Sequence, residues 1–234
     1  ARKIKLEKVI VGTKDTIKEG SEMAKLGVSM MITGLIGTVT TLFIISYIKR
    51  IGSLSDVGLY TAGLSITTTS LSLDFTAMEV DYFPRLSAIS SDIKKVRILV
   101  NQQSEIMLLI ITPLVIALLI FAPILIRVFL SAEFDSLIIF IRFIAIGTLI
   151  QAANHSMGLI SFAKGDKKVF LLLQIAGNSS LLFFTILGYK IAGLNGIAAM
   201  FIIHAIVCYF LVYITVYKKY NYSMSRSFIK IVFV

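Results

Sequence analysis

Polar side chains recur at helical spacing within strongly apolar stretches of this sequence, where they could form the walls of a hydrated interior. Gln151 and His155 follow Thr148 at i+3 and i+7, which places all three on one face of a helix. Gln174 and Asn178 share a face four residues apart. Their amides and imidazole could bind a polar solute. The alternative is that they only join neighbouring helices, as such groups often do in membranes.

Charged residues also fall within or beside apolar stretches, where a bilayer would make them costly. Asp74 lies about 10 Å of helix rise from Asp81, so it should be well inside. Arg142 lies about two helical turns inside another apolar stretch. Asp74 and Arg142 would therefore each either face a substrate cavity or form a structural ion pair. Lys25 and Glu79 are further candidates, although both could instead lie at the water interface.

Motifs for catalysis or metal binding are absent from the sequence: it contains no HExxH, CxxC, GxSxG or phosphate-binding glycine loop. We therefore expect no cofactor, no metal and no enzyme activity. Any energy coupling would use an ion gradient or the gradient of the substrate. Cys208, the one cysteine, and His204 both lie in an apolar run, where we expect a packing residue and a packed or interhelical histidine.

The elements that position these residues are long apolar segments. The chain has 234 residues, 57% of them hydrophobic, and a mean hydropathy of +0.90. A bilayer core needs roughly 20 apolar residues per helical crossing. The sequence predicts an all-α polytopic membrane protein, a bundle of six transmembrane helices at about 24–48, 57–81, 105–130, 135–162, 168–189 and 194–217. Pro113 and Pro123 lie within the third helix, where each predicts a kink.

Basic residues predict the orientation of this bundle. Of the 23 lysines and arginines, 18 lie on the side of the N-terminus and four on the opposite side, with Arg142 within a span. We therefore expect a cytoplasmic N-terminus. The same distribution accounts for the net charge of +10 without nucleic-acid binding.

The predicted helices divide the rest of the chain into linkers and loops. Residues 1–23 would form a charged cytoplasmic linker, and 82–104 the largest inner loop. Residues 218–234 would form a cytoplasmic tail whose final apolar run resembles the start of a truncated next helix. We therefore expect a fragment of a longer protein.

Five short runs, in this order, are similar to a known family. They are Lys18-Glu19-Gly20-Ser21-Glu22-Met23-Ala24-Lys25-Leu26-Gly27, Asp56-Val57-Gly58-Leu59-Tyr60-Thr61-Ala62-Gly63, Phe75-Thr76-Ala77-Met78 followed by Asp81-Tyr82-Phe83-Pro84-Arg85-Leu86-Ser87, Val100-Asn101-Gln102-Gln103 and Phe162-Ala163-Lys164-Gly165-Asp166. The chain resembles the C-terminal part of the O-antigen and oligosaccharide flippases of bacterial polysaccharide export, in the superfamily of the MATE drug exporters. The resemblance covers nearly the whole chain, but it assigns no binding residue by position.

The resemblance implies one six-helix lobe of a two-lobe transporter in the bacterial inner membrane. Such a protein would move undecaprenyl-diphosphate-linked O-antigen or capsule units by alternating access. Membrane lipids and other polysaccharide-assembly proteins would be its partners. For such cargo, Arg142 and Lys25 are candidates for the phosphates, because a guanidinium forks to two oxygens and an ammonium acts as a point charge.

The cavity candidates for the sugar of such cargo are Gln151, His155, Gln174 and Asn178. Two alternative functions remain. The first is a MATE-like exporter of small molecules, which would use Asp74 and Glu79 for ion coupling. The second is a membrane-embedded enzyme of glycan assembly, which the short outer loops at 49–56, 131–134 and 190–193 disfavour.

Overall fold

A computed structural model describes residues 13–130 and 134–225; within these ranges the side chains of 13–23, 25, 26, 70, 72–79 and 129 are outside the description. Over the described residues the regular elements are helices, with no strand. The all-α fold class predicted from the sequence is therefore confirmed. The helices are α1 (Thr13–Ile51), α2 (Leu54–Ala88), α3 (Ile93–Phe129), α4 (Leu137–Ala163) and α5 (Lys167–Tyr220).

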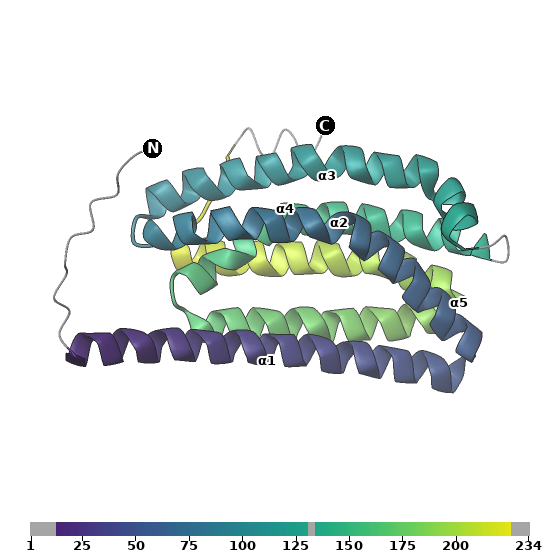
Figure 1. The fold of residues 1–234 in the computed structure, drawn as a ribbon, viewed down its shortest axis with the longest axis horizontal. Helices are drawn as coiled ribbons and strands as arrows, with labels where there is room; N and C mark the ends of the chain where they lie inside the picture. The colour runs from purple at the N-terminus through teal and green to yellow at the C-terminus, as the bar shows by residue number, and fades with distance from the viewer. Residues whose placement is uncertain (1–12, 131–133, 226–234) are drawn as a thin grey trace.

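The long run α5 is a hairpin of two helical segments. Ala192 and Gly193 have non-helical backbone angles, and Gly193 has the positive φ of 59° that favours glycine. The chain reverses there, so the first segment (167–191) lies antiparallel to the second (194–220) (Figure 1). The backbones of Gly188 and Gly196 meet so closely that a Cβ on either residue would clash with the other. With this break, the described chain contains the six helical segments that the hydropathy pattern predicts.

The helices extend well beyond the predicted apolar spans. The predicted loop 82–104 is wrong, because α2 continues to Ala88 and α3 begins at Ile93. Part of the predicted linker 1–23 is also helical, since α1 begins at Thr13. Hydropathy detects only the apolar middle of a helix, whereas an amphipathic or polar end continues helically into water. The final residues 226–234, where a next helix was expected, lie outside the described part.

Capping side chains fix several helix ends. Ser53 and Asp56 form a capping box at the start of α2. Asp92 accepts hydrogen bonds from the main-chain nitrogens of Lys94 and Lys95 at the start of α3. Asp166 caps α5 through the nitrogen of Val169. The short connections 52–53, 89–92 and 164–166 therefore reverse the chain, and they define two ends of the bundle, here called the Gly193 end and the Asp166 end.

Helix α4 lies at the centre of the bundle and packs against α2, α3 and both segments of α5. One buried cluster near the Gly193 end includes Ile44, Tyr60 and Phe140. A second cluster at the Asp166 end includes Tyr82 and Tyr222, both almost fully buried. Tyr82 donates a hydrogen bond to the main-chain oxygen of Ser156, which ties α2 to α4.

The segment after α5 runs back along α3. Arg97 donates to the carbonyl oxygen of Asn221 at 2.7 Å. The Oδ1 atom of Asn101 accepts from the Tyr222 hydroxyl at 3.2 Å and from the main-chain nitrogen of Ser225 at 2.9 Å. Asn101 belongs to one of the runs that carry the family resemblance, and its place in the fold is to hold this segment.

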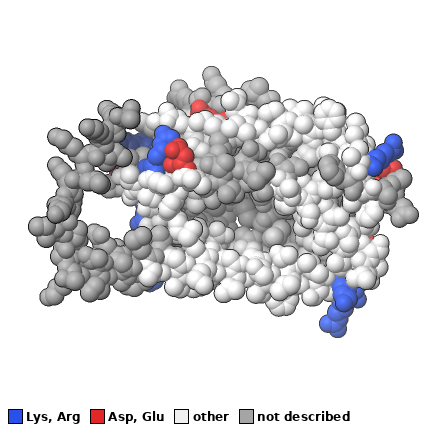
Figure 2. All heavy atoms as spheres, in the orientation of Figure 1, with Lys and Arg blue, Asp and Glu red and all other residues white. Residues whose placement is uncertain are grey.

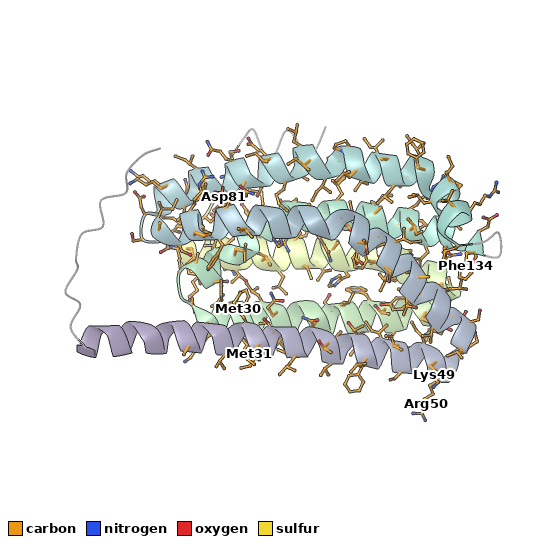
Figure 3. All side chains as sticks on the ribbon, in the orientation of Figure 1. Met30, Met31, Lys49, Arg50, Asp81 and Phe134 are labelled. Carbon is orange, nitrogen blue, oxygen red and sulfur yellow. The ribbon has the colours of Figure 1, made fainter. Side chains whose placement is uncertain are left out.

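The flanks of the bundle are apolar. Large hydrophobic side chains along α1, α3 and α5 are exposed, including Met31, Leu109 and Phe183. In Figure 2, most of the coloured charged side chains lie toward the two ends of the visible face, and the described surface between them is mostly uncharged. Asp81 lies toward the Asp166 end, and Lys49 and Arg50 lie at the opposite end (Figure 3).

Four of the described helices are long and apolar enough to cross a membrane, and they comprise α1 from Gly27, α3, α4 and α5. Run α5 contains two such lengths because of its hairpin. Helix α2 is not among them over its described residues, which exclude 70 and 72–79. Its sequence carries Asp74, Glu79 and Asp81 among several threonines and serines.

Candidate functional site

A cavity of about 600 Å³ lies between α1, α2, α4 and the two segments of α5. Phe83 of α2, Phe162 of α4 and Phe170 of α5 line it, and all three belong to the half of the bundle nearer the Asp166 end. Met30 contributes from α1. Figure 3 labels Met30 on this helix. The volume is within the range of about 300–1,000 Å³ that small-molecule sites occupy.

Helix α4 contributes one polar stripe to this cavity. Gln151, Asn154 and His155 line it, and Gly158 follows without a side chain. Residues three, four and seven positions apart share a helix face, so the local geometry of α4 alone aligns these groups. The Oδ1 atom of Asn154 is buried and has no hydrogen-bond partner among the described residues.

The first segment of α5 contributes Gln174 and Asn178, with Gly177 between them. The Nδ2 group of Asn178 donates to the carbonyl oxygen of Gln174 at 2.9 Å, which holds the amide against its own helix. The second hydrogen of that amide and its Oδ1 atom remain for other partners. The structure thus brings together in one cavity the four residues, Gln151, His155, Gln174 and Asn178, that the sequence proposes for a polar solute.

The second segment of α5 adds Cys208, which the sequence predicts to be a packing residue, and His204, which it predicts to be a packed or interhelical histidine. His204 is 5% exposed, and its Nδ1 atom lies 3.1 Å from the Ser180 hydroxyl of the other segment. This contact confirms an interhelical histidine. The Sγ atom of Cys208 lies 3.6 Å from the same nitrogen. The i, i+4 spacing of His204 and Cys208 is the signal that could have revealed this polar pair, and Asn154 could have been found three residues after Gln151.

Aromatic rings form an apolar wall beside these polar groups. The ring centroids of Phe83 and Phe162 are 5.0 Å apart, and those of Phe162 and Phe170 are 4.7 Å apart. The three rings come from α2, α4 and α5 and therefore join these helices near the Asp166 end. The described lining combines these rings with seven polar side chains.

The charged candidates are not part of the cavity as described. Arg142 is exposed and is absent from the cavity lining; its Nε atom donates to the carbonyl oxygen of Leu119 in α3 at 3.0 Å. Lys25, Asp74 and Glu79 lie on the helical backbones of α1 and α2, but their side chains are outside the described part. Over the described lining, the polar side chains are amides, imidazoles and a thiol.

The Asp166 end is held together by a network of hydrogen bonds and an ion pair. The carboxylate of Asp166 accepts from Lys219 at 2.6 Å and from the Tyr220 hydroxyl at 2.9 Å. The hydrogen bond from Lys219 is the main cause that lowers the pKa of Asp166; partial burial opposes it. Lys164 donates to the carbonyl oxygen of Ser90, which joins the two connections at this end.

The Gly193 end is held by Asp56, which lies in the capping box of α2. Its Oδ2 atom accepts from the Tyr189 hydroxyl at 2.9 Å and from the nitrogen of Ser53 at 3.1 Å. The ring of Tyr189 also meets the ring of Tyr47 edge to face, with centroids 6.2 Å apart. Helices α1, α2 and α5 are therefore joined at this end. Among the described residues, no group of three or more histidine, cysteine or acidic residues could hold a metal ion.

Comparison with known protein families shows to which family this chain belongs. Residues 8–139, more than half of the chain, match the family described as polysaccharide biosynthesis protein. The chain belongs to this family. The family resemblance read from the five short runs is thereby confirmed. A comparison with curated proteins found no significant match.

Solved structures show the same fold. One is an outward-facing multidrug resistance MATE family transporter of the MOP superfamily, with a TM-score of 0.76 at 15% identity, over 90% of this chain and 48% of that one. A second is a MOP superfamily transporter from Pyrococcus furiosus, described as having a binding pocket of reverse polarity. Its TM-score is 0.64 at 17% identity, over 90% of this chain and 50% of that one. A MATE protein in complex with MaD5 aligns with a TM-score of 0.67 at 18% identity, over 89% of this chain and 50% of that one.

These alignments cover about half the length of each transporter. The family and the apolar helices together identify a multi-pass membrane protein, and this chain has the fold of half of a MATE transporter.

Proposed function

We propose that this chain is one lobe of a flippase that moves lipid-linked oligosaccharides across the bacterial inner membrane. The observation that carries the proposal is the cavity, in which Gln151, His155, Gln174 and Asn178 meet inside a bundle of a polysaccharide biosynthesis family. Amide and imidazole groups can both donate and accept hydrogen bonds, as sugar hydroxyls do. A protein that only transferred an apolar lipid would not need such a cavity.

The parts of the cargo have different physical needs. The glycan needs polar walls, which the cavity supplies. The polyprenyl chain can remain in the bilayer beside the exposed apolar flanks of α1, α3 and α5. The diphosphate needs a cation, for which Lys25 on α1 remains the candidate of this chain. Alternating access by this lobe against a second lobe would carry the glycan between leaflets, with no covalent step in the protein.

The proposed setting follows from the distribution of basic residues. Among the described residues, the Asp166 end carries more lysines and arginines than the Gly193 end, so it would face the cytoplasm, and so would the N-terminus. The cavity, which lies toward that end, would then receive cargo after its synthesis on the inner leaflet. Undecaprenyl-diphosphate-linked O-antigen or capsule units, membrane lipids and other polysaccharide-assembly proteins are the proposed partners.

A second candidate function is ion-coupled export of small molecules. The similarity to MATE transporters favours it at the level of the fold. Such an exporter would depend on Asp74 or Glu79 as the site of ion coupling, because a carboxylate can exchange a proton or a sodium ion. The two functions therefore depend on different residues of the same bundle.

The test uses the full-length protein in a strain that lacks it, and it measures radiolabelled glycan on the outer leaflet. Replacing Gln151 and Asn178 together by leucine should lower the rate of glycan appearance about tenfold, because two hydrogen bonds of about 0.5–1.5 kcal/mol each are lost. Gln102→Leu, an exposed amide on α3 outside the cavity, is the matched control and should export normally. The flippase proposal fails if the wild-type protein restores no outer-leaflet glycan but does extrude small organic molecules in an Asp74-dependent way.

A further inference from the structure

We infer that the described wall of this cavity binds uncharged, hydroxyl-rich sugar residues of the cargo in preference to its diphosphate and to acidic sugars. This inference rests on the proposed flippase function and specifies which part of the cargo the site takes. Its basis is the described lining, which combines seven polar side chains without a fixed charge and a wall of three aromatic rings.

The polar lining lacks a counter-charge for an anion. Over the described lining no lysine or arginine is present. The nearest arginine by sequence on α4, Arg142, is directed to the carbonyl oxygen of Leu119 on α3. At the Asp166 end, Lys219 is paired with Asp166, and Lys164 donates to Ser90. An anion that lost its water here would lack the ion pair that burial of a charge requires.

The described lining also lacks a group that could balance the charge of a cation. Over its described residues no carboxylate is present, and the groups that could approach a cation are amide oxygens, imidazoles and one thiol. A small organic cation would meet the three phenylalanine rings, but no balancing charge. An uncharged ligand is therefore the class that the described lining accommodates without an unpaired charge.

The hydrogen-bonding capacity of the lining suits hydroxyl groups. Within the described part of the chain, the side-chain amides of Gln151 and Gln174 form no hydrogen bond to protein. The Oδ1 atom of Asn154 is a buried acceptor without a donor among the described residues. Asn178 uses one amide hydrogen on its own helix and retains the other. A sugar hydroxyl both donates and accepts, so one kind of group can satisfy all of these side chains.

The aromatic wall supplies the other half of carbohydrate recognition. A sugar ring has polar edges and less polar C–H faces. Phe83, Phe162 and Phe170 offer apolar surface beside the amides of α4 and the first segment of α5. A ligand site of this size usually combines such apolar contacts with a few polar groups that fix orientation.

Cys208 provides a reporter, because it lines the cavity and is the one cysteine of this sequence. In the full-length protein with all other cysteines replaced, we would measure the rate of Cys208 alkylation by N-ethylmaleimide in detergent. Three probes would be compared: undecaprenyl diphosphate with a neutral trisaccharide, the same lipid with a terminal uronic acid, and undecaprenyl diphosphate alone. The neutral probe should slow alkylation about tenfold at about ten times its dissociation constant, because occupancy protects the thiol. The other two should protect far less.

A gain-of-function variant makes the test independent of folding defects. Gln174→Lys adds a cation to the cavity and should extend protection to the uronic acid probe, whereas Gln102→Lys on α3, outside the cavity, should not. A cysteine at the exposed Lys190, near the Gly193 end, should be alkylated at the same rate in the presence of each probe.

Equal protection of the wild-type protein by the acidic probe or by the bare diphosphate overturns the inference, as does failure of the neutral probe in a protein that exports glycan. Neither result removes the flippase function, which fails only if the full-length protein delivers no glycan to the outer leaflet.

Discussion

Arg142 of α4 donates a 3.0 Å hydrogen bond from its Nε atom to the main-chain oxygen of Leu119 in α3. In a regular helix this oxygen would accept from the nitrogen of residue 123, but Pro123 has no N–H. Arg142 thus satisfies the carbonyl group that the proline leaves open. The relationship gives the arginine a structural role between two helices and explains how α3 tolerates a proline at this depth.

The first prediction follows from this pair. Arg142→Gln should lower the thermal stability of the full-length protein in detergent, by about 1 kcal/mol, because one hydrogen bond to a main-chain oxygen is lost. Pro123→Ala restores the N–H and should remove most of that effect in the double variant. A double-mutant cycle of unfolding midpoints measures the coupling. If Arg142 instead binds cargo, glycan export will fall with Arg142→Gln and Pro123→Ala will not restore it.

The second prediction concerns the hairpin of α5. Gly196→Ala should prevent accumulation of folded protein, because its Cβ would overlap main-chain atoms of Gly188, which cannot move aside as a flexible side chain can. Gly34→Ala on α1 is the matched control, since no atom lies within 4 Å of its added Cβ, and it should be neutral or slightly stabilising. Abundance and monodispersity of the two variants decide the matter; equal behaviour would mean that the two segments of α5 are not in this close contact.

Much of this fold can be predicted from the sequence, because the hydropathy pattern of a membrane helix is dictated by the bilayer. The six helical segments are recovered, and periodicity alone aligns Gln151 with His155 and Gln174 with Asn178. The helix ends are not recovered, because the polar turns at 82–88 and 93–104 continue helices without being apolar. A window that averages hydropathy cannot distinguish such turns from a loop.

Contacts between distant segments could not be read from periodicity. Pro123 predicts that some donor must reach the Leu119 oxygen, but only the packing of α3 against α4 identifies Arg142. His204 belongs to the cavity because the hairpin folds the second segment of α5 back across the first. Local spacing gives the face of a helix, whereas the neighbour of that face depends on the whole bundle.

The third prediction tests the orientation in the membrane. Cysteines at Leu54 and Lys190, both exposed near the Gly193 end, should react with an impermeant thiol reagent in intact cells, in a Cys208-free background. A cysteine at the exposed Ser91, near the Asp166 end, should react only after the membrane is opened. These positions avoid Ser53 and Gly193, because Ser53 caps α2 and Gly193 has a positive φ. The reverse labelling pattern would place the Asp166 end outside and remove the argument from basic residues.

The fourth prediction concerns Asp166 and its dependence on pH. The hydrogen bond from Lys219 lowers the pKa of this carboxyl group in the folded protein, and Tyr220 and the nitrogen of Val169 add to the effect. A lowered pKa means that the folded state favours the ionised form. The resulting stability is present above the unfolded pKa of about 3.9 and is lost as the pH falls through the folded value.

Asp166→Asn keeps a side chain that can cap α5 but removes the charge. The unfolding midpoint of the wild-type protein should therefore exceed that of Asp166→Asn at pH 7, and the difference should close below about pH 4. Asp81→Asn is the control: its partner Arg85 is on the surface, with the Asp81 side chain 75% exposed, so its loss should change stability by less than about 1 kcal/mol. A gap for Asp166→Asn that stays constant from pH 7 to pH 3 would show that the carboxylate charge does not hold the Asp166 end together.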